Sequence, residues 1–209
     1  MRRSIVAPLP ARLALAFLAL AWAGPAAVAQ EPDCVVVEQA GAVQVLRAAR
    51  AELAAVGAPV SAQDAIRTGS AGKVRLECRG GLVIAIGPAT RVGIDRYLAP
   101  ADGSRLEAAL AMAFGIVRLI TGAPRPGRAV SVETATAVAS TRSTEWLVDA
   151  TARGTGVLAL EGRVEVTGAG VTVVLEPGEG TDVAPGAPPS EPRVWGAARR
   201  ADALARTTF

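Results

Sequence analysis

Residues 73–86 read KVRLECRGGLVIAI, and this stretch decides the class of fold. In its first half Val74, Leu76 and Cys78 alternate with charged side chains, which is the period-2 pattern of a strand with one buried face. A glycine pair at 80–81 then interrupts the pattern, and a continuous apolar run follows. Two apolar runs separated by two glycines predict a β-hairpin with a two-residue turn.

The same short period continues through most of the chain. Segment 106–120 combines alanines with Gly115 and a run of valine, leucine and isoleucine, and we expect it to be mainly strand. Gly41 lies between two apolar runs and predicts a bend or a hairpin. Short strands closed by glycine or proline indicate an all-β protein, arranged as a sandwich, a roll or a solenoid. Further strands are expected at 35–37, 43–46, 65–67, 91–95, 130–132, 136–142, 145–151, 156–160, 163–167 and 171–175.

The first 29 residues have a different composition from the rest. They contain basic residues but no acidic ones, then an apolar run at 13–23, then the small residues Ala-Val-Ala at 27–29. This order is typical of a secretory signal peptide, here cleaved after Ala29. A membrane anchor would need roughly 20 uninterrupted apolar residues, and a Gly-Pro pair at 24–25 breaks this run. We therefore expect an exported, periplasmic protein with no transmembrane anchor after cleavage.

Charge and composition exclude several functional classes. The whole chain has 22 basic and 19 acidic residues, but Arg2, Arg3 and Arg12 lie in the leader, so the remainder has 22 − 3 = 19 of each. A nucleic-acid interface would normally need a basic surface, so no nucleic-acid partner is predicted. The absence of histidine excludes His-based triads, and two cysteines are too few for a four-cysteine zinc site. We predict no catalytic site, no metal and no cofactor.

The two cysteines are candidates for a disulfide, because export makes one chemically possible. Cys34 lies near the start of the mature chain, and Cys78 is expected on the core face of its strand. We therefore predict a Cys34–Cys78 bond. The alternative is a pair of free buried thiols that behave as small apolar side chains.

The C-terminal part is expected to differ from the β-domain. Residues 185–192 read PGAPPSEP, and since proline has no backbone N–H this segment is predicted to be a linker. The remaining residues could form a short helix that docks through Trp195 and Leu204, but we favour a frayed terminus over an interaction tail. The predicted organisation is a signal peptide at 1–29, an all-β domain at 30–184, and a linker and tail at 185–209.

A second functional hypothesis starts from the carboxylates. Glu133, Glu145 and Asp149 could in principle supply the two acids that glycoside hydrolysis requires. An envelope glycan hydrolase with paired carboxylates is therefore an alternative to a binding module. Such an enzyme would hold two acids in one pocket with their pKa values driven apart.

The ordered series of motifs over residues 40–183 resembles the FecR-like periplasmic domain, known from regulators of iron-uptake sigma factors and from free-standing exported proteins. The motifs, in chain order, are Gly41-x-Val43-x-Val45, Ile66-x-Thr68-Gly69, Gly72-x-Val74-x-Leu76, Gly81-Leu82-x-Ile84-x-Ile86-Gly87-Pro88-x-Thr90, Val130-x-Val132-x-Thr134, Ala137-Val138-Ala139 with Arg142-Ser143-Thr144-Glu145-Trp146, Leu160-Glu161-Gly162-x-Val164-x-Val166, and Leu175-x-Pro177-Gly178-Glu179-Gly180.

The resemblance implies an all-β periplasmic domain that acts by binding. The regulators carry a cytoplasmic anti-sigma segment and a membrane helix ahead of this domain, whereas a cleavable leader is predicted here, so their cytoplasmic role is not expected to transfer. We therefore expect a non-catalytic binding or scaffolding module linked to envelope signalling. The expected partner is an envelope protein or a cell-wall or capsule polysaccharide, and a purely structural envelope protein is a further alternative.

One motif departs from the family pattern. Ser143 replaces the usual glycine and Trp146 replaces the usual phenylalanine. Arg142 and Glu145 lie in this element and are our candidates for a contact surface. The simpler interpretation, which we favour, is a cross-strand ion pair between them. The expected core consists of Trp146, by analogy with the family, and of alternating residues in the strands, namely Val74, Leu76, Val164, Val166 and Val173.

Overall fold

The structure of the protein is a computed structural model, which describes residues 31–209 apart from 49, 123–125 and 143–144. The predicted signal peptide at 1–29 lies outside the described residues. Within the part of the chain that is described, no helix is long and apolar enough to cross a membrane. Residues 32–209 form one compact unit, and the description below concerns this unit.

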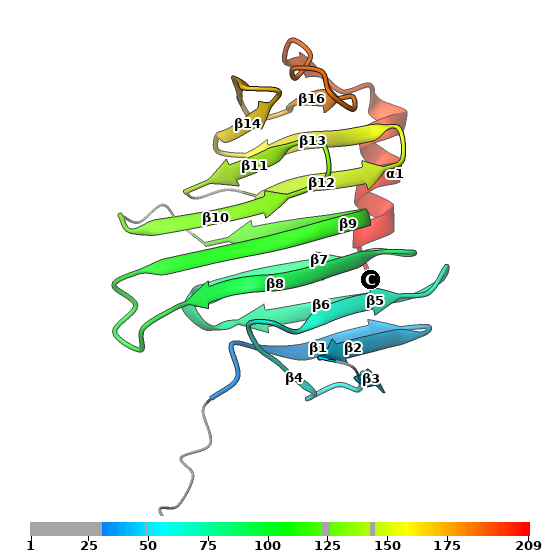
Figure 1. Cartoon of the computed structure of the whole chain (residues 1–209), viewed down its shortest axis with the longest axis vertical. Helices are drawn as coiled ribbons and strands as arrows, with labels where there is room; N and C mark the ends of the chain where they lie inside the picture. The colour runs from blue at the N-terminus through cyan, green and yellow to red at the C-terminus, as the bar shows by residue number, and fades with distance from the viewer. Residues whose placement is uncertain (1–30, 49, 123–125, 143–144) are drawn as a thin grey trace, which may run out of the picture. The chain divides into compact units, whose positions relative to one another are not determined.

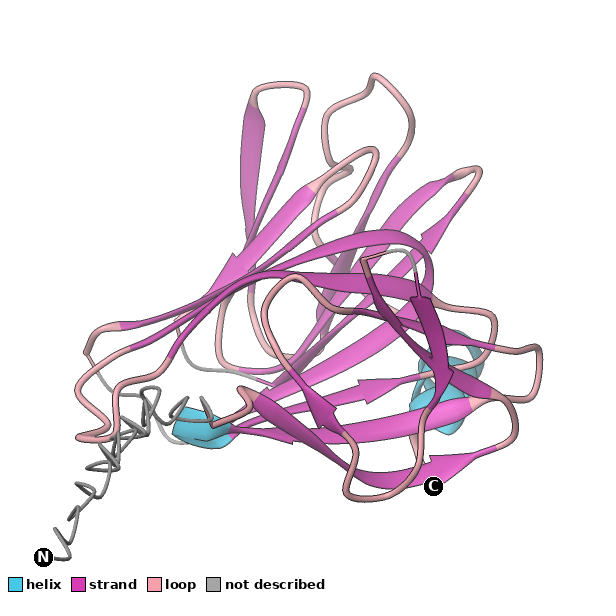
Figure 2. Cartoon of the chain, turned by 60° about the horizontal axis from the view of Figure 1, so that its bottom comes forward, coloured by secondary structure: helices cyan, strands magenta, loops and turns pink. Residues whose placement is uncertain are grey.

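The strands form two layers, here called sheet A and sheet B (Figure 1), and the prediction of an all-β protein is confirmed. Sheet A contains, in order across the sheet, β4 (Pro59–Val60), β1 (Cys34–Ala40), β6 (Lys73–Cys78), β7 (Leu82–Ile86), the second half of β9 (Leu106–Thr121), β12 (Glu145–Thr151), β13 (Gly154–Glu161), β16 (Glu179–Val183) and β17 (Arg193–Val194). Sheet B contains β3 (Arg50–Leu53), β2 (Val43–Arg47), β5 (Ala65–Thr68), β8 (Arg91–Leu98), the first half of β9, β10 (Arg128–Glu133), β11 (Val138–Thr141), β14 (Val164–Gly168) and β15 (Val171–Leu175). Neighbouring strands are antiparallel except β9 and β10, which are parallel. The helix α1 (Ala197–Thr207) lies outside the layers of strands (Figure 2).

Strand β9 belongs to both sheets. Residues 106–114 pair with β8 and β10 in sheet B, whereas residues 115–121 pair with β7 and β12 in sheet A. The change of sheet occurs at Gly115, whose φ is +103°, and a Cβ atom there would lie 2.4 Å from the Cα of Thr90. Only glycine fits this backbone conformation and this close approach. The prediction that 106–120 is mainly strand is confirmed, and the glycine in its middle is a bend between two layers.

The chain repeatedly crosses between the sheets at glycine-containing corners, and neighbouring corners are hydrogen-bonded to one another. The Gly69 N–H donates to the Ala42 carbonyl over 2.8 Å, and the Ala89 N–H donates to the Gly69 carbonyl over 2.8 Å. Gly41 forms such a corner, because β1 lies in sheet A and β2 in sheet B. Of the two predicted alternatives at this glycine, the bend is therefore correct and the hairpin is wrong.

Two buried threonine side chains link adjacent corners by hydrogen bonds to backbone groups. The Thr68 hydroxyl donates to the Gly87 carbonyl over 2.7 Å and accepts from the Thr90 N–H over 2.9 Å. The Thr90 hydroxyl in turn accepts from the Ile116 N–H over 2.9 Å. Both side chains are almost fully buried, so these bonds satisfy backbone groups that the corners leave without a ladder partner. Thr68 and Thr90 are both members of the motif series recognised in the sequence.

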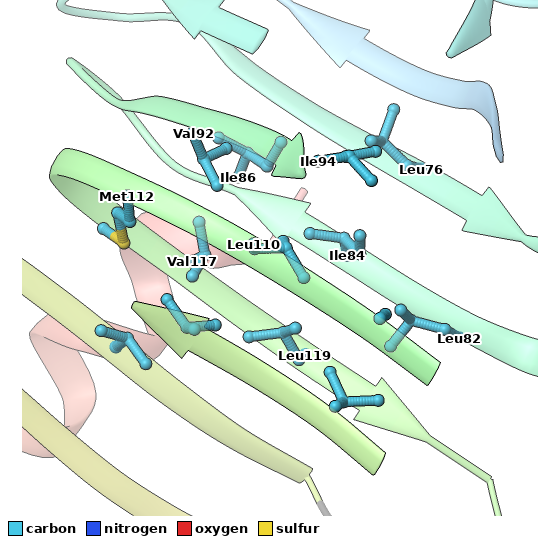
Figure 3. Close-up of a cluster of buried hydrophobic side chains, with 14 of the residues drawn as sticks. Leu76, Leu82, Ile84, Ile86, Val92, Ile94, Leu110, Met112, Val117 and Leu119 are labelled. Atoms are coloured by element: carbon cyan, nitrogen blue, oxygen red, sulfur yellow. The ribbon is translucent and has the colours of Figure 1, made fainter. Parts of the chain in front are cut away.

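The core lies between the two sheets. Figure 3 shows side chains from sheet A, such as Ile84 and Leu119, facing side chains from sheet B, such as Ile94 and Leu110. The expected core residues are buried, with one at the margin. Val74, Leu76, Val164, Val166 and Trp146 have no exposed surface, whereas Val173 is partly buried and packs against the core.

The hairpin at 73–86 is present, but its turn is longer than predicted. Cys78 pairs with Leu82, so the turn contains Arg79 as well as the two glycines. Arg79 leaves the strand because its N–H donates to the Asp33 carbonyl over 2.9 Å and its carbonyl accepts from the Tyr97 hydroxyl. These contacts come from distant segments, which the local sequence pattern could not reveal.

The predicted disulfide is present. Cys34 in β1 and Cys78 in β6 lie directly opposite one another in the antiparallel register, and their sulfur atoms are bonded. Both side chains face the core, with 1% and 8% of their surface exposed. The bond closes a loop between residues 44 positions apart, which by the chain-entropy estimate stabilises the fold by up to about 4 kcal/mol.

Candidate functional site

The outer face of sheet A is covered by the C-terminal segment. Ile116, Leu147 and Leu158 project outward from β9, β12 and β13 and are nonetheless fully buried. They form an apolar cluster with Trp195 and with Ala203 of α1. The end of the chain therefore closes a second, smaller core on this face, and it is a packed helix rather than the frayed terminus that we favoured from the sequence.

Two glycines make room for the indole of Trp195. A Cβ atom on Gly180 would lie 2.2 Å from the Trp195 Nε1, and a Cβ atom on Gly156 would lie 3.3 Å from the far edge of the ring. Arg199 lies over the ring, with its guanidinium carbon 3.5 Å from the ring centroid. The indole thus contacts both glycines and makes a cation–π contact with Arg199.

Charged side chains fix α1 across the strands of sheet A. Arg206 donates two hydrogen bonds to the carboxylate of Asp149 in β12, the shorter being 2.7 Å, and Arg199 pairs with Asp182 in β16. At the C-terminal end of the helix, the Lys73 ammonium also donates to the carbonyls of Ala205 and Thr208, over 2.8 Å each. The helix therefore spans the sheet from β16 to β6, as Figure 1 shows.

These ion pairs alter the ionisation of their members. Hydrogen bonds from Arg199 hold the pKa of Asp182 below its ordinary value, against the opposing effect of partial burial. The same hydrogen bond raises the pKa of Arg199, and the bond to Asp149 raises that of Arg206. Asp182, Arg199 and Arg206 are therefore stabilised in their charged forms at neutral pH.

The proline-rich segment ahead of α1 is fastened to β16. The Asp182 N–H donates to the Ser190 hydroxyl over 3.1 Å, and the Ser190 N–H donates to the Asp182 carbonyl over 3.0 Å. The Thr181 hydroxyl also donates to the Ser190 carbonyl over 2.7 Å. Residues 185–192 therefore run back along the domain, and this path positions Trp195 beside Gly156 and Gly180.

The outer face of sheet B carries no such cover among the described residues. Its middle consists of very small side chains, because Ala65, Gly93 and Ala111 lie next to one another in register on β5, β8 and β9. They form part of the lining of a hollow of about 570 Å³ that also includes Arg91 and Glu133. This hollow is partly apolar and bordered by charges of both signs.

Arg142 lines a second hollow on the same face. This hollow, of about 620 Å³, is bordered by Arg142, Arg163 and Glu165, with Ala129 and Val174 as its apolar part. Arg142 is exposed at the end of β11. Its guanidinium is thus available at the surface, as the contact-surface hypothesis requires.

Glu145 lies on the other sheet. It begins β12 in sheet A and accepts a 2.6 Å hydrogen bond from the Arg118 Nε of β9. The ion pair described for Glu145 is therefore with Arg118, and not with Arg142 as the simpler sequence interpretation supposed. The two candidate contact charges are close in sequence but belong to elements of different sheets.

The structure does not bring the candidate catalytic carboxylates together. Glu133 lies at the end of β10 on sheet B, whereas Glu145 and Asp149 lie on β12 of sheet A. The two acids on β12 are each ion-paired with an arginine, Arg118 and Arg206 respectively. Within the described part of the chain, no cluster of three or more acidic or cysteine side chains could hold a metal ion.

Sequence reasoning named Trp195 as a docking residue of a possible helix, but it missed the other residues that organise the covered face. The spacing of Arg199, Ala203 and Arg206 places them on one side of a helix, which is a readable signal. The acidic partners of the two arginines, Asp182 and Asp149, lie 17 and 57 positions away in the sequence. They are on strands whose register is defined only by the fold. Nothing in the local sequence around Gly156 and Gly180 indicates that the two glycines make room for an indole.

Comparisons with known proteins agree with this fold. Residues 64–165, just under half of the chain, match the family described as FecR protein. Two crystal structures of a protein from Parabacteroides distasonis ATCC 8503, named as a "putative anti-sigma factor", are similar in fold, with TM-scores of 0.55 and 0.54. Both are 17% identical in sequence, and each comparison covers 67% of this chain. No curated protein sequence matches the chain.

These similarities have defined limits. The match to the crystal structures covers 64% and 63% of their chains, so this chain spans just under two thirds of their length. At 17% identity the likeness concerns the fold alone. The family match lies inside the range 40–183 over which the motif series was recognised in the sequence.

Proposed function

The chain carries a FecR domain at residues 64–165, and on that basis we propose that it is a non-catalytic binding or scaffolding module of the bacterial envelope, acting in the periplasm and linked to envelope signalling. The open outer face of sheet B is its proposed contact surface. The proposed partner is an envelope protein, with a cell-wall or capsule polysaccharide as the alternative.

The observation that carries this proposal is the difference in cover between the two outer faces. Sheet A is closed by α1 and Trp195, whereas the small side chains of sheet B around Gly93 and Ala111 stay accessible. Charges of both signs border this surface, including Arg91, Arg142 and Glu133. A mixed border of this kind suits the polar rim of a protein interface, where charges set orientation and the rate of encounter.

Site-specific photo-crosslinking in the periplasm of living cells tests the proposed surface. A benzophenone amino acid at Ala111 or Ser131 on sheet B should give crosslinked products. The same group at Ala201, exposed on α1, should give few and serves as the matched control. Products that are sensitive to protease and identified by mass spectrometry would indicate an envelope protein, and protease-resistant material would indicate the polysaccharide. Equal crosslinking from all three positions would contradict the assignment to sheet B.

Arg142 and Glu145 remain the proposed contact charges, but Glu145 lies on sheet A and outside the face proposed above, so charge reversal at Arg142 should weaken the interaction found by crosslinking more than reversal at Glu145. The two substitutions should differ in their effect on stability. Arg142→Glu should weaken binding without moving the thermal midpoint, because Arg142 is exposed. Glu145→Lys should also lower the stability, by up to about 1 kcal/mol, because it releases half-buried Arg118. Arg153→Glu, at the exposed turn after β12, is the control and should leave binding unchanged.

The competing hypothesis of an envelope glycan hydrolase is tested on the same purified protein. The mature chain is incubated with cell-wall and capsule glycans, and released reducing ends are measured. We expect no turnover. Hydrolysis that a single substitution at Glu133, Glu145 or Asp149 abolishes would overturn the proposal of a non-catalytic module.

A further inference from the structure

The described sheets end in edge strands that differ in how they are protected. A free sheet edge presents unpaired backbone N–H and C=O groups, and natural proteins protect such edges with short strands, prolines or charges. Strand β4 has two residues, one of them Pro59, and β17 has two residues, one of them Arg193. Strand β3 carries Arg50 and Glu52 in its four residues. These three edges are therefore poor templates for another strand.

The remaining edge, β15, has none of these protections. Its five residues read VTVVL, without charge, proline or glycine. Val171 and Val174 are 47% and 46% exposed. Among the described residues β14 is its one strand partner, so its other side is open. The composition is that of an interior strand, although the position is at the margin of sheet B.

The turn before β15 defines which of its backbone groups are open. Ala169 and Gly170 form a two-residue turn with φ values of +45° and +78°, and Gly168 pairs with Val171. In such hairpins the closing pair exchanges both hydrogen bonds, and bonded and non-bonded pairs then alternate. The N–H and C=O groups of Thr172 and Val174 therefore point away from β14.

We propose that β15 is a dimerisation edge, which pairs in antiparallel orientation with β15 of a second copy of this chain. The pairing is centred on Val173, so that Thr172 lies opposite Val174 of the second copy, and Val174 lies opposite its Thr172. Sheet B then continues across the dimer as one sheet. This inference does not rest on the function proposed above, because the pairing uses the backbone edge of β15, although the Val174 side chain also lines the hollow beside Arg142 on the face of sheet B.

Self-complementarity is the reason to choose a second copy over another occupant. The two residues with outward backbone groups are two positions apart, so a two-fold axis through Val173 sets each opposite the other, and each of the two pairs exchanges both of its bonds. No charged residue lies within the strand to oppose its own copy. The pairing also places exposed Val171 beside Leu175 of the second copy, which removes apolar surface from water.

A proline substitution tests the pairing and keeps the backbone hydrogen bonds of the hairpin, although it removes the 2.8 Å hydrogen bond between the Thr167 and Thr172 hydroxyls. Thr172→Pro removes an N–H that points away from β14, a position at which an edge strand tolerates proline. The matched control is Ala51→Pro in β3. The pair Arg47–Arg50 closes the β2–β3 hairpin, so the Ala51 N–H also points outward, but on a charged edge. Sedimentation velocity of the mature protein over a dilution series should show a dimer for the wild type and for Ala51→Pro, and a monomer for Thr172→Pro.

A second variant and a second measurement keep the test decisive. If circular dichroism shows that Thr172→Pro is unfolded, Val174→Lys takes its place, because it leaves the backbone intact and places a lysine on the open edge. Hydrogen exchange at Thr172 and Val174 should slow as protein concentration rises in the wild type and stay fast in the monomeric variant. A wild type that is monomeric at every concentration, or a dimer that survives both β15 variants, would overturn the proposal.

Discussion

The outer faces of sheets A and B are both formed by alternate residues of their strands, but one face is covered and the other is accessible. On sheet A the outward side chains Ile116, Leu147 and Leu158 are large and apolar, and a helix and a tryptophan cover them. On sheet B the corresponding positions carry small residues such as Gly93 and Ala111, and no helix covers this face among the described residues. The size of the outward side chains thus determines whether a sheet face becomes a second core or an accessible surface.

The largest expected effect comes from removing the cover of sheet A. Deletion of residues 193–209 exposes Ile116, Leu147 and Leu158, each of which contributes about 1.5–3 kcal/mol when buried. The truncated protein should have a much lower unfolding midpoint in urea and should bind a hydrophobic dye. Removal of Phe209 alone, which is 43% exposed, is the control and should change little. A truncated protein as stable as the full chain would show that the cluster does not contribute.

A single residue should reproduce a large part of this loss. Trp195 is 5% exposed and fills the space above Gly156 and Gly180. Trp195→Ala should therefore lower the free energy of unfolding by about 3 kcal/mol. On the open face, Phe114→Ala should cost much less, because Phe114 is 46% exposed. Equal losses in chemical denaturation would contradict the distinction between the faces.

Adding a methyl group should have opposite consequences on the two faces. In Gly180→Ala the new Cβ would meet the Trp195 ring at 2.2 Å, and such overpacking costs about 1–3 kcal/mol. In Gly93→Ala the nearest atom would be the Asp95 Oδ1 at 3.5 Å, an ordinary contact. Because glycine weakens a strand by roughly 0.5–1 kcal/mol relative to alanine, Gly93→Ala should be neutral or stabilising. Thermal midpoints of the two variants measure this difference directly.

The smallest expected effect is a pH dependence of the covered face. The pKa of Asp182 is lowered in the folded state, mainly by hydrogen bonds from Arg199. Its contribution is therefore present above the ordinary pKa of aspartate, about 4, and is lost as the pH falls through the lower folded value. Asp182→Asn should reduce stability at pH 7 by no more than about 1 kcal/mol, because the pair is partly exposed.

The difference between wild type and Asp182→Asn should shrink as the pH falls from about 4 through the lower folded-state pKa of Asp182, below which the aspartate is protonated in both states. Urea titrations at several pH values measure it. Asp95→Asn, an equally conservative change beside the open face, is the control and should leave stability nearly unchanged at every pH. A constant difference at all pH values would show that the charge of Asp182 is not the cause.

Local patterns predicted most of the sheet, and the failures have identifiable causes. Strands such as β6, with its alternating Val74 and Leu76, carry their burial pattern in the sequence. The strands β3 and β4 were missed because they are short, exposed or interrupted by proline, so they have no apolar period. Strand β16 was missed because a glycine and two acidic residues, Glu179 and Asp182, leave it without an apolar period. In the fold Trp195 lies against Gly180 and Arg199 pairs with Asp182.

In the candidate site, too, the sequence predicted one feature correctly and another wrongly. Arg142 was singled out from a motif and is exposed beside a hollow, but its supposed partner Glu145 pairs with Arg118. The neighbours of a strand residue across the sheet come from strand order, and strand order depends on contacts between distant segments. No spacing in the sequence relates residue 118 to residue 145, whereas the β9–β12 register places Glu145 opposite Ile120 and brings the two charges within reach.

The sequence by itself determined the all-β class, the inward residues of most strands and the pairing of Cys34 with Cys78. These features follow from the fixed two-residue period of a strand and from the presence of only two cysteines. The tertiary structure alone decided that β9 divides between two sheets at Gly115 and that α1 forms on sheet A. A helix of 11 residues is marginal in isolation, so its stability must come from the Trp195 cluster and the ion pairs with β12 and β16, which exist only once the strands are assembled.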